Sequence, residues 1–426
     1  MKKILPMSHG LHGEIIVPGD KSISHRSIML SSLADTPVEI TNFLRGADCL
    51  STINCMRAMG VNIEEFGDKI LVKGNGLNGL TEPNNVLDAG NSGTTLRLLM
   101  GLLSAQNFLT TFTGDDSLRN RPMKRVIDPL SKMNANIVGR NRNKNLPITI
   151  IPTTQKLKAI TYEMVVASAQ VKSAILLAGL YADGITTVIE PCPSRDHTEK
   201  MLTAFNVRID KNGNAIKIQP PEKLIAPDKI EVPSDISSAA YWIVLASILK
   251  DSDIIIKNVG INETRTGIID VLKEMGANIN LINIRTSGGE KSADIHVVSS
   301  KLHGVKFGGK MIPRLIDEIP VIAVAAAFAD GDTIIDNVGE LRVKETDRLD
   351  AIVKEFNKIA SGAFRANDDS LFIYGGKKFN FAKCETYNDH RMAMSLAVFG
   401  AAANGVEIDN SECVNISYPK FFEFML

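Results

Sequence analysis

The chain has 426 residues, of which 44% are hydrophobic and 5% aromatic, and this length exceeds one ordinary hydrophobic core. Lysine and arginine number 48 together, as do aspartate and glutamate, which excludes the global basic field that drives non-specific nucleic-acid binding. Five cysteines show no zinc-ligand spacing and the apolar runs are too short to span a membrane, so we expect a cytoplasmic protein with reduced thiols and no metal.

A helix that ends in a bulky residue followed by glycine or asparagine, and then by a short strand, recurs at intervals of roughly 70 to 80 residues. The positions are Met59-Gly60, Met133-Asn134, Phe205-Asn206, Met275-Gly276 and, more loosely, Phe356-Asn357. Glycine and asparagine tolerate the left-handed conformation that closes a helix. The pattern predicts repeated α/β units in two globular halves, although such junctions occur in any α/β protein and say little about function.

Prolines interrupt strand-like segments near residues 17–19 and 231–234, which are plausible crossings between the two halves. We therefore expect residues 1–19 and 233–426 to form one domain and residues 20–232 to form the other.

Two turns rich in small residues each follow a strand-like segment and open an apolar helix. The first is residues 18–26, with Lys21, Ser22 and Arg26, and the second is residues 87–99. Unpaired backbone N–H groups at a helix start attract anions, and nearby cations and hydroxyls strengthen that attraction. An N-capped surface helix, or a close helix–strand contact, would leave the same local pattern, and neither turn has Walker P-loop spacing.

Three later segments, residues 117–123, 168–172 and 194–199, also place Arg or Lys near a predicted helix start. In the last of them we expect a capped helix after two prolines, with Arg195 at its N-terminus and His197 in a structural or solvent-facing role.

The second half of the chain supplies carboxylates beside cations. Asp317 precedes a small apolar helix, and Glu345 lies in a charged run in which Lys344 and Arg348 are spaced to share one helical face. A solvated surface explains such a run when it is taken alone. Several cationic helix starts in a chain without net charge favour instead a site for two multiply charged ligands.

Taken in order, residues 19–26, 89–95, 342–348 and 388–391 resemble the family of 5-enolpyruvylshikimate-3-phosphate synthases over nearly the whole chain. The resemblance implies an α/β fold, namely a two-domain inside-out barrel built from six βαβαββ repeats, with the active site in a cleft that closes on substrate. It also implies small-molecule substrates, shikimate 3-phosphate and phosphoenolpyruvate, and no cofactor.

The residues that the resemblance assigns fall into two sets. For shikimate 3-phosphate they are Lys21, Ser22, Arg26, Ser168, Ala169, Gln170, Arg195, Asp317 and Lys344. For phosphoenolpyruvate they are Lys21, Gly93, Arg121, Gln170, Arg348 and Arg391.

The mechanism that the resemblance implies is addition followed by elimination through a tetrahedral ketal. Asp317 is suited to accept the proton of the attacking hydroxyl, Glu345 to deliver and remove a proton at C3 of phosphoenolpyruvate, and Lys21 to act beside them. These are the expected catalytic residues, and which carboxylate performs which step is a hypothesis.

Three positions bear on inhibition by glyphosate. Ala169 replaces the second serine found in one branch of the family, whereas Gly93 matches the glycine of sensitive enzymes. A lysine common near the C-terminus is replaced by Ile416 in an ungapped reading. We predict weak to intermediate inhibition by glyphosate.

Two alternatives remain from the sequence. A transferase that acts on UDP-N-acetylglucosamine would share the fold, but it commonly has cysteine where this chain has Asp116, and Lys-Asn where it has Lys21-Ser22. A non-catalytic protein that binds phosphorylated metabolites is the other. We expect a monomer without nucleic-acid or membrane partners.

Overall fold

The computed structural model describes residues 1–423 and 425 and divides the chain into two compact units. Unit 1 consists of Met1–Pro18, Pro233–Arg285 and Lys291–Leu426, and unit 2 of Gly19–Val232 and Thr286–Glu290. The segment 286–290 belongs to unit 2 because the Ser287 hydroxyl accepts a hydrogen bond from the Glu231 N–H, at 3.0 Å, and Glu290 pairs with His197. Nothing in the sequence separates this segment from its neighbours.

Unit 2 contains three four-stranded sheets, each with one parallel strand pair followed by antiparallel pairs. The first is β14 (Lys229–Glu231), β3 (Val38–Thr41), β5 (Lys69–Lys73) and β4 (Asn62–Phe66). The second is β6 (Leu87–Asp88), β7 (Thr110–Thr113), β9 (Asn145–Ile151) and β8 (Asn136–Gly139). The third is β10 (Thr161–Glu163), β11 (Thr186–Ile189), β13 (Ala215–Ile218) and β12 (Ile209–Asn212).

Unit 1 repeats this arrangement, but strands from the start of the chain complete two of its sheets. One sheet is β2 (His12–Ile15), β15 (Asp253–Gly260), β17 (Glu290–Val298) and β16 (Asn278–Ser287). The next is β18 (Lys306–Phe307), β19 (Asp332–Asp336), β21 (Ser370–Tyr374) and β20 (Phe364–Ala366). The last is β22 (Ala382–Cys384), β23 (Val406–Ile408) and β1 (Lys2–Ile4), where β1 pairs antiparallel to β23.

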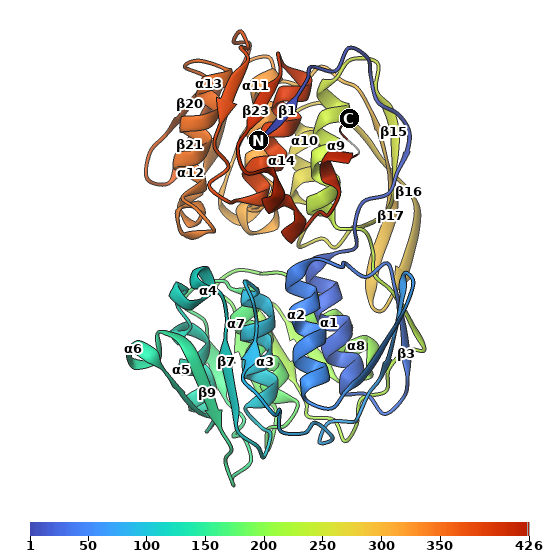
Figure 1. The fold of residues 1–426 in the computed structure, drawn as a ribbon, viewed down its shortest axis with the longest axis vertical. Helices are drawn as coiled ribbons and strands as arrows, with labels where there is room; N and C mark the ends of the chain where they lie inside the picture. Colours follow the sequence, from blue (N-terminus) through green and yellow to red (C-terminus); the bar gives the residue numbers. More distant parts are fainter. Residues whose placement is uncertain (424, 426) are drawn as a thin grey trace. The chain divides into compact units, whose positions relative to one another are not determined.

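In each unit one helix per repeat lies in the core. They are α1 (Lys21–Ser32), α3 (Gly93–Leu103) and α7 (Ala169–Gly179) in unit 2, and α9 (Ile236–Ile248), α11 (Ile319–Phe328) and α14 (His390–Ala402) in unit 1. These helices are buried on nearly every side, whereas strands such as β5 alternate buried and exposed residues. Figure 1 shows the core helices within each unit and the strands around them. Helices inside and sheets outside confirm the predicted inside-out α/β architecture.

The remaining helices lie in the second connection of each repeat or in loops. They are α2 (Ala47–Ala58), α4 (Asp116–Asn120), α5 (Lys124–Lys132), α6 (Arg140–Asn143), α8 (His197–Ala204), α10 (Gly267–Glu274), α12 (Arg348–Ala351) and α13 (Asn357–Ile359). Short 3₁₀ or π segments are η1 (Gly309–Arg314), η2 (Gly339–Val343), η3 (Ile352–Phe356), η4 (Ser411–Ile416) and η5 (Phe421–Glu423). In the part of the chain that the structure describes, none of the helices has the length and apolarity that a membrane span requires.

Four of the predicted helix–strand junctions are left-handed at the expected residue. Positive φ values occur at Gly60 (86°), Asn134 (70°), Asn206 (62°) and Gly276 (95°). The fifth prediction, at Phe356-Asn357, is wrong.

At this fifth position the π segment η3 continues directly into α13, and the left-handed residue is Gly362, with φ of 73°. Asn357 is helical instead, and its side chain bonds both backbone polar groups of Phe364 in β20, at 2.8 and 3.0 Å. The asparagine therefore connects helix and strand through its side chain rather than through its φ.

Candidate functional site

Lys21 and Ser22 lie in the first turn of α1 in unit 2. Asp20 caps the helix, and its carboxylate accepts a hydrogen bond from the Ile23 N–H at 2.9 Å. The Lys21 ammonium pairs with the nearly buried carboxylate of Asp48 in α2. The predicted helix start is therefore present, with a lysine held at the end of the helix that favours anions.

Arg26, one turn further along α1, is 5% exposed. Its guanidinium donates to three neutral acceptors: the hydroxyls of Thr198 (2.7 Å) and Ser173 (2.9 Å), and the carbonyl of Ser22 (2.9 Å). These bonds fix its plane without neutralising its charge, so the group remains able to bind an anion.

The electrostatic surroundings of Arg26 include a second predicted site residue. Burial lowers the pKa of Arg26 to about 10, while the charge on Glu199 raises it and the charge on Arg195 lowers it. Arg26 and Arg195 are thus near enough to repel one another. Two neighbouring guanidinium groups favour a multiply charged anion such as a phosphate monoester.

A second group of predicted residues gathers where α3 begins. The Arg97 guanidinium donates to the side-chain oxygen of Gln170, and Arg121 Nη2 donates to Asn91 Oδ1 at 2.8 Å. A Cβ placed on Gly93 would lie 2.9 Å from Arg97 Nη1 and 3.5 Å from Arg121 Nη1. The structure therefore brings Gly93, Arg121 and Gln170 together, and the missing side chain of Gly93 leaves room beside two guanidinium groups.

Arg97 carries a buried charge with positive neighbours. Burial lowers its pKa to about 9, and the charges of Arg125 and Arg121 lower it further. Its Nε has no hydrogen-bond partner among the described residues. A buried cation in this state is stabilised by an anion, so we add Arg97 to the candidate site.

Ser168 and Ala169 begin α7. Ser168 is the N-cap, its hydroxyl accepting from the Val171 N–H at 3.5 Å, and Ala169 is the first helical residue. Gln170 follows and donates to the Thr94 hydroxyl at 3.1 Å, which connects this helix start with that of α3.

In unit 1, Arg348 is the centre of a carboxylate cluster and its side chain is 1% exposed. It lies 2.7 Å from Asp389, 2.6 Å from Glu345 and 3.5 Å from Asp317. Although burial lowers the pKa of Arg348, the charges of Asp389 and Glu345 raise it above its ordinary value. The guanidinium is therefore permanently charged and held in place.

Asp317 lies between two arginines of unit 1. Its carboxylate oxygens are 3.5 Å from Arg348 Nη1 and 3.5 Å from Arg391 Nη2, and Arg391 Nη1 donates to the Asp317 carbonyl at 3.3 Å. Arg391 belongs to the first turn of α14, which Asp389 caps. The cap therefore orients both arginines, because it bonds the helix start and Arg348 at once.

Glu345 is ionised in this cluster. Burial raises its pKa, but the charges of Arg348 and His390 outweigh burial and hold the pKa well below the usual range of a glutamate. Glu345 is therefore an anion in the free protein, and the cation beside it lowers its affinity for a proton.

Lys344 does not share a helical face with Arg348, contrary to the sequence analysis. The 3₁₀ segment η2 ends at Val343, Lys344 is extended, and Asp347 caps a new helix that begins at Arg348. The Lys344 ammonium instead pairs with Glu340 at 3.0 Å. A helix cannot continue across this cap, so the four-residue spacing did not indicate a common face.

The sequence placed Arg97 in a possible anion-binding helix start within residues 87–99, without assigning it to a substrate, and it indicated no role for Asp48 or Asp389. Asp389 stands at a helix start, a signal that could have placed it. Asp48 comes from another helix, and its pairing with Lys21 depends on tertiary structure.

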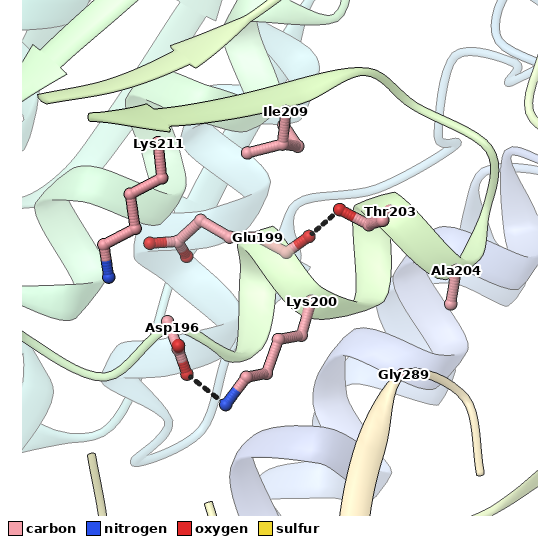
Figure 2. A pocket seen from close by; sticks show the side chains of 8 residues that line it. All are labelled: Asp196, Glu199, Lys200, Thr203, Ala204, Ile209, Lys211 and Gly289. Atoms are coloured by element: carbon pink, nitrogen blue, oxygen red, sulfur yellow. Dashed lines mark hydrogen bonds and ion pairs between the residues drawn. The ribbon is translucent and has the colours of Figure 1, made fainter. Parts of the chain in front are cut away.

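A pocket of about 380 Å³ lies along α8 in unit 2 and contains none of the predicted substrate or catalytic residues. Figure 2 shows its lining, with Lys200 paired to Asp196 at 3.1 Å and Glu199 beside them. Glu199 is also an ion-pair partner of the buried Lys172. The pocket therefore adjoins the network behind Arg26 rather than the residues expected to meet substrate.

Comparison with known proteins gives consistent results. The family model of EPSP synthase (3-phosphoshikimate 1-carboxyvinyltransferase) matches residues 7–425. A 3-phosphoshikimate 1-carboxyvinyltransferase of Thermoanaerobacter sp. (strain X514) is 54% identical over 97% of this chain and 96% of its own. A 3-phosphoshikimate 1-carboxyvinyltransferase of Bacillus cereus (strain G9842) is 50% identical over 99% of this chain and 98% of its own.

Among solved structures, an EPSP synthase from Acinetobacter baumannii aligns with a TM-score of 0.90 and 43% sequence identity, covering 99% of this chain and 96% of that one. The same fold, near-complete coverage and high identity agree with the cationic side chains found at helix starts in both units. The chain belongs to the EPSP synthase (3-phosphoshikimate 1-carboxyvinyltransferase) family.

Proposed function

We propose that this protein transfers the enolpyruvyl group of phosphoenolpyruvate to the 5-hydroxyl of shikimate 3-phosphate and releases phosphate, a step of the shikimate pathway to aromatic amino acids. The observation that carries the proposal is the family match over residues 7–425, within which relatives bear the name of this activity. A transferase acting on UDP-N-acetylglucosamine is not favoured, because the curated relatives bear the other name.

Shikimate 3-phosphate is bound, in this proposal, mainly by unit 2. Arg26 and Arg195 supply positive charge to its phosphate, with Lys21, Ser22, Ser168, Ala169 and Gln170 around the same helix starts. Support comes from the neutral partners of Arg26, which leave its charge for a ligand. Asp317 and Lys344 add contacts from unit 1, and the partly exposed pair of Lys344 with Glu340 is weak enough to be exchanged for a substrate.

Phosphoenolpyruvate carries a phosphate and a carboxylate, and we assign Lys21, Gly93, Arg121, Gln170, Arg348 and Arg391 to it. Guanidinium groups bind both anions through paired N–H donors, which orients the reacting carbon as well as holding the ligand. The close approach of Arg97 and Arg121 to Gly93, where a side chain would crowd Arg97, supports this assignment.

Catalysis then requires proton transfers in two steps. In the addition step Asp317 accepts the proton of the 5-hydroxyl while that oxygen attacks C2, and Glu345 delivers a proton to C3. In the elimination step Glu345 takes a proton back from C3, phosphate departs with the proton that Asp317 had accepted, and Lys21 stabilises the charge that develops nearby.

The ionised state of Glu345 in the free protein must change before Glu345 can deliver a proton in this scheme. In the free protein Arg348 keeps it ionised, which suits a base and not an acid. A bound anion that shares the charge of Arg348 weakens this effect and raises the pKa of Glu345. We therefore propose that phosphoenolpyruvate itself prepares Glu345 for protonation.

The test is phosphate release from phosphoenolpyruvate by the purified protein, run in parallel with shikimate 3-phosphate and with UDP-N-acetylglucosamine as acceptor. Release with shikimate 3-phosphate alone is expected. Release only with the sugar nucleotide would move the activity to the other transferase, and release with neither would favour a binding protein without catalysis.

We also propose that the protein acts as a monomer in the cytoplasm. Its five cysteines are free thiols, as is usual in a reducing compartment. Light scattering on the eluting protein gives the mass directly, and a value near twice 46.3 kDa would contradict the monomer.

A further inference from the structure

Lys172 is a lysine buried inside a core helix. It lies in α7 with its side chain 1% exposed, and its ammonium is 2.9 Å from Glu190 and 2.7 Å from Glu199. The two carboxylates are 2% and 8% exposed. We call these three residues the Lys172 cluster.

Stability alone does not explain the Lys172 cluster. Taking three charges out of water costs free energy that their mutual attraction repays only in part, and an apolar set of similar volume is often as stable. The residues that follow in α7, such as Ala174, Ile175 and Leu176, are apolar and fully buried. An apolar residue at position 172 would be in keeping with them.

One carboxylate of the cluster fixes the segment before Arg195. Glu190 Oε1 accepts hydrogen bonds from the backbone N–H of Ser194, at 3.2 Å, and from its hydroxyl. Lys172 donates to the carbonyl of the same serine at 3.4 Å. The residue directly preceding Arg195 is therefore held through its N–H, hydroxyl and carbonyl.

The other side of the cluster adjoins both hydroxyls that hold Arg26. Ser173 follows Lys172 and Thr198 precedes Glu199 in the sequence, and their hydroxyls are 2.6 Å apart. Each of them accepts a hydrogen bond from the Arg26 guanidinium. The charge of Glu199 also acts on Arg26, where it raises the pKa.

We propose that the Lys172 cluster is a positioning device that holds Arg26 and Arg195 at the spacing needed for the phosphate of shikimate 3-phosphate. This inference rests on the proposed function, which assigns both arginines to that substrate. Lys172 touches no substrate in this scheme. Its ammonium pairs with both Glu190 and Glu199, so that neither carboxylate turns to an arginine and competes with the phosphate.

The central test is Lys172→Met, which keeps the length of the side chain and removes its charge. We expect the KM for shikimate 3-phosphate to rise at least tenfold, while the KM for phosphoenolpyruvate changes less than threefold. Lys73→Met is the matched control, because Lys73 of unit 2 forms an ion pair with Glu64 at the surface, at 2.6 Å. The control should leave both KM values unchanged.

A double variant tests whether the unpaired carboxylates cause the loss of affinity expected in Lys172→Met. In Lys172→Met/Glu199→Gln one of the two unpaired carboxylates is removed, and we expect the KM for shikimate 3-phosphate to recover at least threefold relative to Lys172→Met. If Lys172→Met does not fold, Glu190→Gln replaces it, since this variant keeps the Lys172–Glu199 pair and weakens the hold on Ser194. It should raise the same KM selectively.

Two results would overturn the inference. One is a folded Lys172→Met, or Glu190→Gln in its place, whose KM for shikimate 3-phosphate stays within threefold of the parent. The other is an equal rise in both KM values, which indicates a general structural defect. Failure of the proposed function is distinct, because then the unaltered protein itself gives no turnover with shikimate 3-phosphate.

Discussion

A methyl group at position 93 would meet two guanidinium groups, those of Arg97 and Arg121. Gly93→Ala should therefore displace the guanidinium of Arg97, which the new Cβ would approach to 2.9 Å, and raise the KM for phosphoenolpyruvate about tenfold, a change of about 1.4 kcal/mol. The KM for shikimate 3-phosphate should change less than threefold. Steady-state kinetics with each substrate varied in turn measures both values.

Gly260→Ala is the control for this change, because a Cβ at Gly260 makes only ordinary contact, 3.5 Å from Pro233. If Gly93→Ala leaves the KM for phosphoenolpyruvate as it was, the assignment of Gly93 and Arg121 to that substrate fails.

The proposed proton-transfer role of Glu345 predicts an effect on kcat rather than on KM. Glu345→Gln keeps a hydrogen-bond acceptor for Arg348 but cannot exchange a proton, so kcat should fall more than a hundredfold, about 2.7 kcal/mol in the barrier. Single-turnover phosphate release, together with exchange of the C3 protons with solvent deuterium, measures the step directly.

Glu412→Gln, a change at the surface of unit 1, provides the comparison and should be as active as the parent. Turnover of Glu345→Gln within tenfold of the parent would remove its proton-transfer role.

At the scale of the helix and strand, the sequence predicts where most helices begin and end. Four helix ends were predicted at the correct glycine or asparagine, because a left-handed residue must follow the last turn and few residue types accept it. The fifth failed because a π segment shifted the register, and Asn357 used its side chain instead. Helix starts could be predicted equally well where a polar N-cap residue preceded an apolar run, as at Asp20 and Ser168.

Contacts between residues of distant elements could not be predicted from the sequence. The ion pair of Lys21 with Asp48 and the contact of Arg97 with Gln170 arise from the way whole helices pack, and no local pattern records them. Lys344 shows the converse error, since regular spacing suggested a common face that the cap at Asp347 prevents. The candidate residues were therefore predictable as members of a family motif, and their partners were not.

Because α3 and α7 are in close contact at Gly101, we expect a substitution there to lower the stability of the protein. A Cβ at Gly101 would lie 2.1 Å from the carbonyl oxygen of Ala174 in α7, so the helices must separate to accept it. Gly101→Ala should lower the free energy of unfolding by about 1 to 3 kcal/mol, as measured by urea denaturation. Gly184→Ala, whose Cβ has an ordinary contact at 3.5 Å, should be nearly neutral. Equal stability of both variants would show that α3 and α7 adjust without cost.

For the whole molecule, a buried histidine links stability to pH. His25 bonds Thr52, which bonds Thr95, so that α1, α2 and α3 are connected at 2.6 and 2.7 Å. Burial lowers the pKa of His25 to about 3. Since the unfolded chain binds a proton near pH 6.5 and the folded chain does not, stability is complete above that pH and is lost as the pH falls toward 3, by about 1.4 kcal/mol per pH unit.

His25→Asn tests this dependence, because asparagine can keep a hydrogen bond to Thr52 and does not titrate. Urea unfolding at pH 7.5 and pH 5.5 should show a decline in the parent that exceeds the decline in the variant by about 1.4 kcal/mol. The same decline in both proteins would mean that His25 titrates freely in the folded state.

The route of the chain through its sheets has a consequence for synthesis. Unit 2 is complete once residue 290 has been made, whereas in unit 1 the strand β1 pairs with β23, near the other end of the chain. On the ribosome, unit 2 therefore has all of its strands while every strand of the last two sheets of unit 1 except β1 is still to be translated. The first strand to emerge is among the last to find its neighbour, so a nascent chain must keep Lys2–Ile4 unpaired, and open to wrong partners, for almost the full time of translation.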